Sequence, residues 1–235
     1  ISFISLVLSI TLYVLSLRSK DKAALYTKLA GNAFWLHFIS LLGGIGALYY
    51  LIGNHCFEYS YVWQYSSRDM PLKYIVSCFW AGQEGSYLVW AFWQGIIGLW
   101  LLRTSKEWKN WVMPVFATGQ FFLVSMVLGF NLGGFHVGGS PFGLLRNMPQ
   151  NMGEELFKQA NYLDFLVDGN GLNPLLENIW MIIHPPSLFL GYAVVLVPFS
   201  YAIASMWRKE YHSWLKPAIP WTIAAILALG NGIIL

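Results

Sequence analysis

Charged residues are scarce in this chain. They make up 11% of its 235 residues, whereas hydrophobic residues make up 57%, and a soluble domain of ordinary composition carries roughly twice that share of charge. The charges fall in a few stretches and leave apolar runs of about 17–22 residues, which is long enough to cross a hydrocarbon core of about 30 Å. The formal net charge of +3 is too small to indicate nucleic-acid binding. The composition therefore favours a protein embedded in a lipid bilayer.

Cysteine is also nearly absent. Cys56 and Cys78 are the two cysteines, no CxxC or CxxCH motif occurs, and both residues fall on or near one loop. They are either a disulfide, if that loop faces an oxidising compartment, or two free thiols. The sequence shows no nucleophile–base pair and no metal-ligand cluster of His, Cys and carboxylates, so no catalytic residue is assigned.

Six apolar runs predict transmembrane helices. Each run is too long for a strand and lacks the period-two alternation of a membrane barrel, and open irregular backbone is not viable in lipid. The expected fold is an all-α, polytopic transmembrane helical bundle that forms a single transmembrane domain over residues 1–235. The predicted spans are about 1–17, 33–52, 86–102, 111–130, 187–207 and 218–235.

The distribution of charge predicts the orientation of the bundle. Ten of the fourteen basic residues fall in the loops after the first, third and fifth spans, and eight of the eleven acidic residues fall on the other side. The positive-inside rule places the basic side in the cytoplasm. The outer segments, about 53–85 and 131–186, are long and rich in aromatics and glycine, so we expect function on that face. Short interfacial helices are predicted at 71–80 and 153–167.

Four histidines have ordinary explanations. His37 lies within the second span, where an ionisable residue is either functional or a neutral imidazole bonded to a neighbouring helix. His55 and His136 are interpreted as surface residues of the outer loops, and His136 lies in a glycine-rich, flexible stretch. His212 is interpreted as an interfacial anchor on the cytoplasmic side.

His184 differs because Pro185 and Pro186 follow it. A residue before proline favours extended geometry, and proline suits the first turn of a helix. We therefore expect His184 at the outer mouth of the fifth span, with its ring held in a fixed direction. Axial ligation of a haem iron needs such an imidazole, although a packed histidine at a helix start has the same pattern.

Aromatic residues gather near the outer face and also have two interpretations. They form an interfacial belt or a wall for a large planar cofactor, to which Trp80 and Trp90 would contribute. Glu84 opens the third span and is expected to need a hydrogen-bond partner. Arg68 is the candidate partner.

Five motifs in order resemble one family. They are Tyr65-Ser66-Ser67-Arg68-Asp69-Met70-Pro71, Trp80-Ala81-Gly82-Gln83-Glu84-Gly85-Ser86, Ser140-Pro141-Phe142, Gly171-Leu172-Asn173-Pro174-Leu175-Leu176-Glu177-Asn178, and His184-Pro185-Pro186-Ser187-Leu188-Phe189-Leu190-Gly191-Tyr192. Their order and spacing resemble the CcmF/NrfE branch of the cytochrome c haem lyase family, which groups with CcsA among haem-handling proteins.

The resemblance implies cytochrome c biogenesis in a bacterial inner (cytoplasmic) membrane. Such proteins hold haem b at the outer face and promote its covalent attachment to the CxxCH cysteines of apocytochrome c. Haem arrives on a CcmE-like chaperone, and other maturation subunits are partners. The resemblance assigns haem-iron ligation to His184. Arg68 and Arg146 become candidate partners of the haem propionates, and Trp80 and Trp90 candidate parts of a haem wall.

Two departures from the family pattern are visible. The tryptophan-rich outer loop and the second outer histidine are expected beyond Leu235, so we expect this chain to be an N-terminal fragment that is inactive by itself. Gln83 stands where a histidine often occurs in the family, and no ligand role is assigned to it. The alternatives are a haem transporter or exporter and a non-catalytic membrane scaffold subunit.

Overall fold

The computed structural model describes residues 1–235, except for the side chains of Asn131, Leu132 and His136. The chain divides into two compact units, each assembled from segments far apart in the sequence. The first unit comprises residues 1–43, 89–125 and 186–235, and the second comprises residues 44–88 and 126–185. Three long helices, α2, α5 and α8, pass from one unit into the other.

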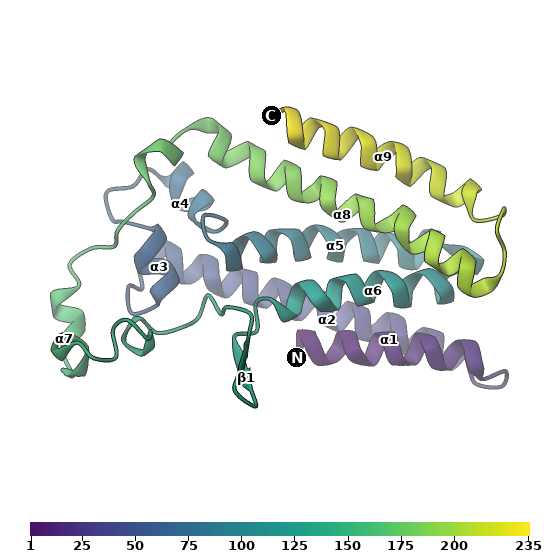
Figure 1. The fold of residues 1–235 in the computed structure, drawn as a ribbon, viewed down its shortest axis with the longest axis horizontal. Coiled ribbons are helices and arrows are strands. Elements are labelled where there is room, and N and C mark those ends of the chain that lie inside the picture. Colours follow the sequence, from purple (N-terminus) through teal and green to yellow (C-terminus); the bar gives the residue numbers. More distant parts are fainter. The chain divides into compact units, whose positions relative to one another are not determined.

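The first unit is a bundle of long helices (Figure 1). Its helices are α1 (Ser2–Arg18), α6 (Lys109–Ser125), α9 (Leu215–Ile234) and the larger parts of α2 (Ala23–Gly53), α5 (Gln83–Thr104) and α8 (Ile179–Arg208), with the short helix η1 (Lys106–Trp108) before α6. Helix α1 packs against α6, and the ring centroids of Phe3 and Phe121 lie 4.7 Å apart at that contact. The hydroxyl of Tyr201 in α8 donates to the Ser105 hydroxyl, at 3.2 Å.

The second unit consists of short elements joined by loops. They are α3 (Ser60–Tyr65), α4 (Leu72–Cys78), β1 (Phe130–Leu132), β2 (Phe135–Val137), η2 (Leu145–Asn147), α7 (Glu155–Lys158), η3 (Tyr162–Phe165) and η4 (Pro174–Leu176). The predicted interfacial helices correspond to α4 and to the short α7 and η3. The all-α expectation holds for the chain apart from the β1–β2 hairpin. That hairpin replaces the flexible stretch predicted around His136, because Gly133 and Gly134 take the positive φ values of 55° and 91° that a two-residue turn requires.

Each of the six predicted spans coincides with a long helix, but the helix bounds differ. Four of them, α2, α5, α8 and α9, are long and apolar enough to cross a membrane, so the structure supports four of the six predicted spans by this measure. Helix α1 is apolar but has 17 residues, and α6 also has 17. The protein is therefore a multi-pass membrane protein. Helix α2 begins ten residues before its predicted span and α8 eight residues before, whereas α6 ends at Ser125, five residues early.

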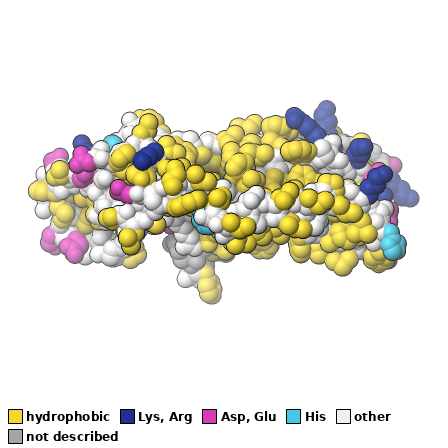
Figure 2. Space-filling view, turned by 90° about the horizontal axis from the view of Figure 1, so that it is seen from above, with side chains coloured by type: hydrophobic (Ala, Val, Ile, Leu, Met, Phe, Trp, Pro, Cys, Tyr) yellow, Lys and Arg dark blue, Asp and Glu magenta, His cyan; other side chains and the backbone are white. Residues whose placement is uncertain are grey.

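The charges separate between the two units as the sequence predicted for the two sides. All ten basic residues assigned to the cytoplasmic side belong to the first unit, together with three acidic residues. The second unit holds the other four basic and the other eight acidic residues. The α1–α2, α5–α6 and α8–α9 loops lie at the same end of the first unit (Figure 1), and Lys and Arg side chains gather there (Figure 2).

His37 is fully buried inside the helical bundle. Its Nδ1 lies 2.8 Å from the Ser2 hydroxyl, and its Nε2 lies 3.0 Å from the Gln120 amide nitrogen. The Gln120 amide nitrogen also donates to the Ala91 carbonyl at 2.9 Å. These contacts favour the neutral imidazole bonded to neighbouring helices, because the Gln120 amide nitrogen can only donate and the Nε2 atom that accepts from it carries no proton.

Helices α8 and α9 approach each other closely at two glycines. A Cβ atom at Gly191 would lie 2.6 Å from the Leu229 Cα atom, and one at Gly232 would lie 2.7 Å from the Leu188 Cα atom. Small residues allow this backbone approach between membrane helices. Gly230, two residues earlier in α9, has no atom within 4 Å of the same position.

We predict that Gly232→Ala destabilises the protein by about 1–3 kcal/mol, because the added methyl group meets backbone rather than a movable side chain. The matched control is Gly230→Ala, which should leave the thermal unfolding midpoint in detergent unchanged or raise it, because alanine is favoured over glycine inside a helix. Equal midpoints for the two variants would contradict the close α8–α9 contact.

Candidate functional site

Helix α8 begins well before the His184-Pro185-Pro186 motif. Its first residue is Ile179, and the Asn178 side-chain oxygen accepts hydrogen bonds from the backbone N–H groups of Trp180 (2.9 Å) and Met181 (3.2 Å). This is the geometry of a helix N-cap. The prediction that His184 precedes the helix in extended geometry is therefore wrong: His184 is the sixth residue of α8.

A tryptophan compensates for the proline that follows His184. Pro185 has no backbone N–H, so it gives no helical hydrogen bond to the carbonyl of Met181, four residues earlier. The Trp80 indole N–H donates to that carbonyl instead, at 2.8 Å. A residue before proline disfavours helical geometry because of local steric contacts. Here the helix continues through His184, and the Trp80 indole, from a distant part of the sequence, supplies the hydrogen bond that Pro185 cannot give.

The His184 ring is half-buried, and its Nδ1 atom is fully enclosed. Within the part of the chain that the structure describes, this nitrogen has no hydrogen-bond partner. A buried polar atom without a partner costs about 1–3 kcal/mol. His184 is thus a half-buried imidazole with one unsatisfied ring nitrogen among the described residues.

Two further tryptophans of α5 contact α8 within the helical unit. The ring centroid of Trp90 lies 6.0 Å from that of Phe189 and 5.3 Å from that of Tyr192. The Trp93 indole donates to the Pro186 carbonyl at 3.1 Å. The Trp90 indole N–H is buried and has no partner among the described residues. Trp80 and Trp90, the two residues predicted to form a wall for a planar cofactor, therefore both contact helix α8.

Tyr61 holds the turn that carries Trp80, and sequence reasoning missed this role. Its hydroxyl donates to the Phe79 carbonyl at 2.8 Å and accepts from the Gly82 N–H at 3.0 Å. A Cβ atom at Gly82 would collide with the rings of Tyr61 and Tyr65. Burial raises the pKa of the Tyr61 hydroxyl, so the group stays protonated and remains a donor.

The Arg68 motif packs against a loop one hundred residues later. The Asp168 carboxylate accepts from the backbone N–H groups of Arg68 (2.9 Å) and Gly169 (2.7 Å), and the Gly171 N–H donates to the Ser66 carbonyl at 3.2 Å. The Arg68 guanidinium lies over the Phe57 ring, 5.7 Å from its centroid. These contacts join two of the five motifs.

Glu84 does not form the ion pair with Arg68 that the sequence suggested. The ion pairs found among the described residues are Lys158–Glu155 and Arg208–Glu210. The Glu84 carboxylate instead lies against Gly139, where a Cβ atom would be 2.6 Å from Oε1. The loop between β2 and η2 therefore shields this acid.

Arg146 and Gln83 lie at the surface. The Arg146 guanidinium lies over the Tyr162 ring, 5.0 Å from its centroid, and donates to the Phe157 carbonyl at 3.4 Å. The Gln83 amide donates to the Tyr87 hydroxyl at 2.8 Å. Arg68 and Arg146 are thus exposed cations held by aromatic rings, and each lies in its own part of the second unit.

The remaining histidines are not part of this arrangement. His55 has a positive φ of 52° and, like His184, a buried Nδ1 without a partner among the described residues. His212 is exposed on the α8–α9 loop. The side chain of His136 lies outside the described part of the structure.

Both cysteines are free thiols. Cys78 is buried, and its Sγ lies 3.3 Å from the Met70 sulfur. Burial raises the pKa of the Cys78 thiol to about 12. Burial and the nearby Glu58 carboxylate also raise the pKa of Cys56. Of the two interpretations from sequence, the structure favours free thiols.

Together, the apolar helices and the motif-bearing second unit define the class, a multi-pass helical membrane protein. A family model described as "Cytochrome C assembly protein" matches residues 80–234. The chain therefore belongs to the cytochrome c assembly protein family.

Three comparisons describe its relatives. The chain is 32% identical to the cytochrome c-type biogenesis protein CcmF of Haemophilus influenzae, over 99% of this chain and 33% of the relative. It is 28% identical to the probable cytochrome c-type biogenesis protein NrfE of Escherichia coli, over 84% of this chain and 32% of the relative. The solved structure of a cytochrome c heme lyase CcmF has the same fold, with a TM-score of 0.72 and 22% identity over 98% of this chain and 33% of that one. The chain spans about a third of the length of the proteins it matches.

The link between Trp80 and Pro185 predicts a specific coupling. Trp80→Phe should lower the free energy of unfolding by about 1 kcal/mol, because a carbonyl loses its donor. In a Pro185→Ala background the same change should cost little, because the substituted alanine supplies a helical N–H to the Met181 carbonyl. A double-mutant cycle on unfolding in detergent measures the coupling. Additive effects would show that the indole does not replace the missing helical bond.

The raised pKa of the buried Cys78 thiol predicts that its rate of alkylation depends strongly on pH. Since the thiolate is the nucleophile, alkylation of Cys78 at pH 8 should be very slow and should rise about tenfold per pH unit until its pKa is reached. Maleimide labelling followed by peptide mass spectrometry reads both sites. After denaturation without reductant, both cysteines should react. Failure of both to react would mean that they form a disulfide.

Proposed function

We propose that this chain is part of a cytochrome c haem lyase, in which it helps to hold haem for attachment to apocytochrome c. The observation that carries the proposal is the half-buried His184 ring in α8, whose enclosed Nδ1 has no partner and whose Nε2 is not among the enclosed, unpartnered atoms of the described residues, so Nε2 is the nitrogen that would reach the iron. The family assignment and the relatives named for cytochrome c-type biogenesis support it. Because the relatives are about three times longer, the activity belongs to the longer protein.

The residues present fit haem as the substrate. Imidazole nitrogen is a common axial ligand of haem iron, and His184 offers one from a helix whose start is capped by Asn178 and bound by Trp80. Trp80 bonds to the first turn of that helix within the second unit, and Trp90 contacts Phe189 and Tyr192 of the helix within the first unit, so each supplies aromatic surface. Arg68 and Arg146 are exposed cations without acidic partners among the described residues, which suits pairing with propionates.

The proposed mechanism is positioning. His184 would orient the iron, the tryptophans would shield the ring from water, and Arg68 or Arg146 would pair with a propionate. The haem supplies vinyl groups and apocytochrome c supplies thiols, so thioether formation needs no nucleophile from this chain. Holding the reactants in a defined orientation provides the rate advantage. A CcmE-like chaperone and other maturation subunits would act as partners.

The charge distribution supports a location for this chemistry. The positive-inside rule places the basic loops of the first unit in the cytoplasm of a bacterial inner membrane. The second unit, which holds the start of α8 and four of the five motifs, would then face the periplasm. Apocytochrome c would meet haem there.

In the full-length protein, His184→Ala should reduce haem retention and block cytochrome c maturation while membrane insertion is unchanged. Added imidazole should restore part of the haem signal, because it replaces the lost ligand. Haem spectra of the purified variant and in-gel haem staining of cytochromes c measure the two effects.

The matched control is His55→Asn, which removes the other imidazole with a buried, unpartnered Nδ1. It should retain haem and maturation. Wild-type haem spectra in His184→Ala, or equal loss in both variants, would refute the ligand assignment. Normal cytochromes c in a strain lacking the whole protein would refute the lyase function.

A further inference from the structure

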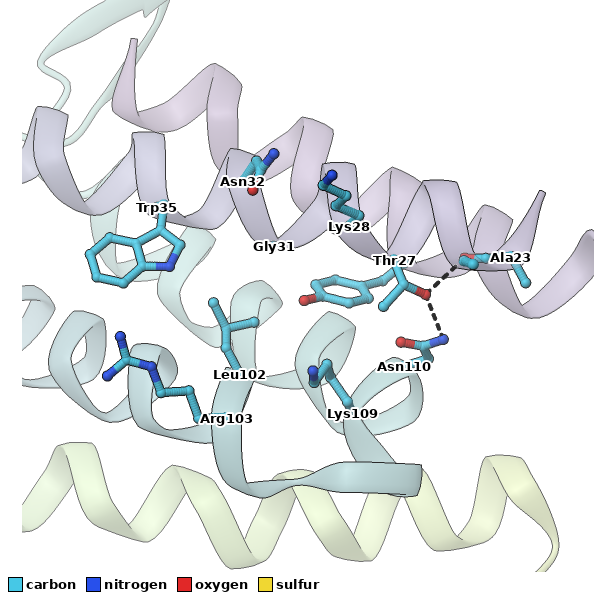
Figure 3. A pocket seen from close by; sticks show the side chains of 12 residues that line it. Ala23, Thr27, Lys28, Gly31, Asn32, Trp35, Leu102, Arg103, Lys109 and Asn110 are labelled. Carbon is cyan, nitrogen blue, oxygen red and sulfur yellow. Dashed lines mark hydrogen bonds between the residues drawn. The ribbon is translucent and has the colours of Figure 1, made fainter.

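A cavity of about 610 Å³ opens at the basic end of the first unit (Figure 3). Helices α1, α2, α5 and α6 all contribute to its lining. Three of the lining side chains are cations, and none is acidic. The cations are Lys28, Arg103 and Lys109.

The cavity therefore has an unbalanced positive charge. Each cation comes from a different helix, α2, α5 or α6, so the bundle brings together charges that are distant in the sequence. Lys28, Arg103 and Lys109 border the same space in Figure 3. The first residues of α2 and α6 also line it, and the positive ends of helix dipoles favour an anion.

A buried hydroxyl gives independent evidence for a ligand. Tyr13 of α1 lines the cavity, its side chain is 0% exposed, and its hydroxyl has no hydrogen-bond partner among the described residues. An enclosed hydroxyl without a partner is unfavourable. The Thr27 hydroxyl in the same lining does have partners, since it accepts from the Asn110 amide at 2.8 Å and donates to the Ala23 carbonyl at 2.9 Å.

An apolar groove adjoins the basic cavity. It has a volume of about 380 Å³ and is lined by Ile96, Leu99, Trp100 and Thr104 of α5, with Trp35 and Arg103 lining both spaces. The Arg103 guanidinium lies 6.0 Å from the Trp35 ring centroid. The basic cavity and the adjoining apolar groove together suit an amphipathic anion, which has a charged headgroup and an apolar chain. A free inorganic ion would fill the cavity only and leave the groove empty.

We propose that this site binds an anionic phospholipid. The headgroup phosphate lies among Lys28, Arg103 and Lys109 and accepts from the Tyr13 hydroxyl, and one acyl chain lies in the groove along α5. Basic pockets between membrane helices on the cytoplasmic side recognise such headgroups. The site belongs to the helical unit and does not depend on haem binding.

Titration of the detergent-solubilised full-length protein with phosphatidylglycerol and with phosphatidylcholine, followed by native mass spectrometry, tests the proposal. Phosphatidylglycerol should bind preferentially. The variant Lys28→Gln/Arg103→Gln/Lys109→Gln should lose about a hundredfold in affinity, because each basic side chain at an anionic surface contributes about fivefold. Three matched changes outside the cavity, Lys20→Gln, Lys22→Gln and Lys209→Gln, should lose no more than about twofold.

Two further variants keep the charge and test the geometry. Tyr13→Phe removes one hydroxyl and should weaken phosphatidylglycerol binding about threefold to tenfold. Leu99→Trp fills the groove and should weaken lipid binding without changing protection by inorganic phosphate in a thermal unfolding assay. These variants decide the question if the triple variant fails to fold.

Three outcomes would overturn the proposal. Equal binding of both lipids would remove the role of the phosphate charge. Equal losses in the cavity triple and the control triple would mean general surface attraction. The third outcome is that inorganic phosphate displaces the lipid at equal concentration and that Leu99→Trp binds the lipid as tightly as the unchanged protein. This result would identify a site for a free anion.

Discussion

The hydrogen bond from the Trp80 indole to the Met181 carbonyl is the contact on which the candidate site depends. Pro185 leaves that part-buried carbonyl without its helical donor, and a buried carbonyl without a partner is unfavourable. The indole reaches it across 101 residues of sequence and joins the turn before α5 to the first turn of α8. His184 lies three residues further along α8. Its direction is therefore set by a side chain of a distant motif as well as by its own helix.

A second layer of contacts holds Trp80 where it can make this bond. The Tyr61 hydroxyl bonds to both sides of the turn at Phe79 and Gly82, and a Cβ atom at Gly85 would collide with the Phe79 carbonyl. The glycines of the Trp80 motif thus serve close packing around one phenol. The motifs that looked like separate features of the sequence form a series of dependent contacts, from Tyr61 through Trp80 to α8.

Local patterns predicted which segments are helical, but distant contacts decided where some helices begin. The apolar runs located all six long helices. The start of α8 was misplaced, because the proline rule is local, whereas the donor that compensates Pro185 comes from Trp80. Tyr61 could not be identified, since in a segment crowded with tyrosines nothing distinguishes the ring that packs on glycines. His184 and Trp80 were found through their motifs, and their connection required the structure.

The arrangement of the ten basic residues of the first unit needs an explanation of its own. Orientation in the membrane depends on how many basic residues lie on one side, and not on where each one lies. The positive-inside rule is satisfied by cations anywhere in short loops. Lys28, however, lies inside α2, five residues after its start. It lines one cavity with Arg103 and Lys109 from two other helices, around a buried tyrosine hydroxyl. Charges that served topology alone would be expected to spread apart in water, since like charges repel. Their convergence without an acidic residue in the lining is the arrangement that an anionic headgroup would stabilise.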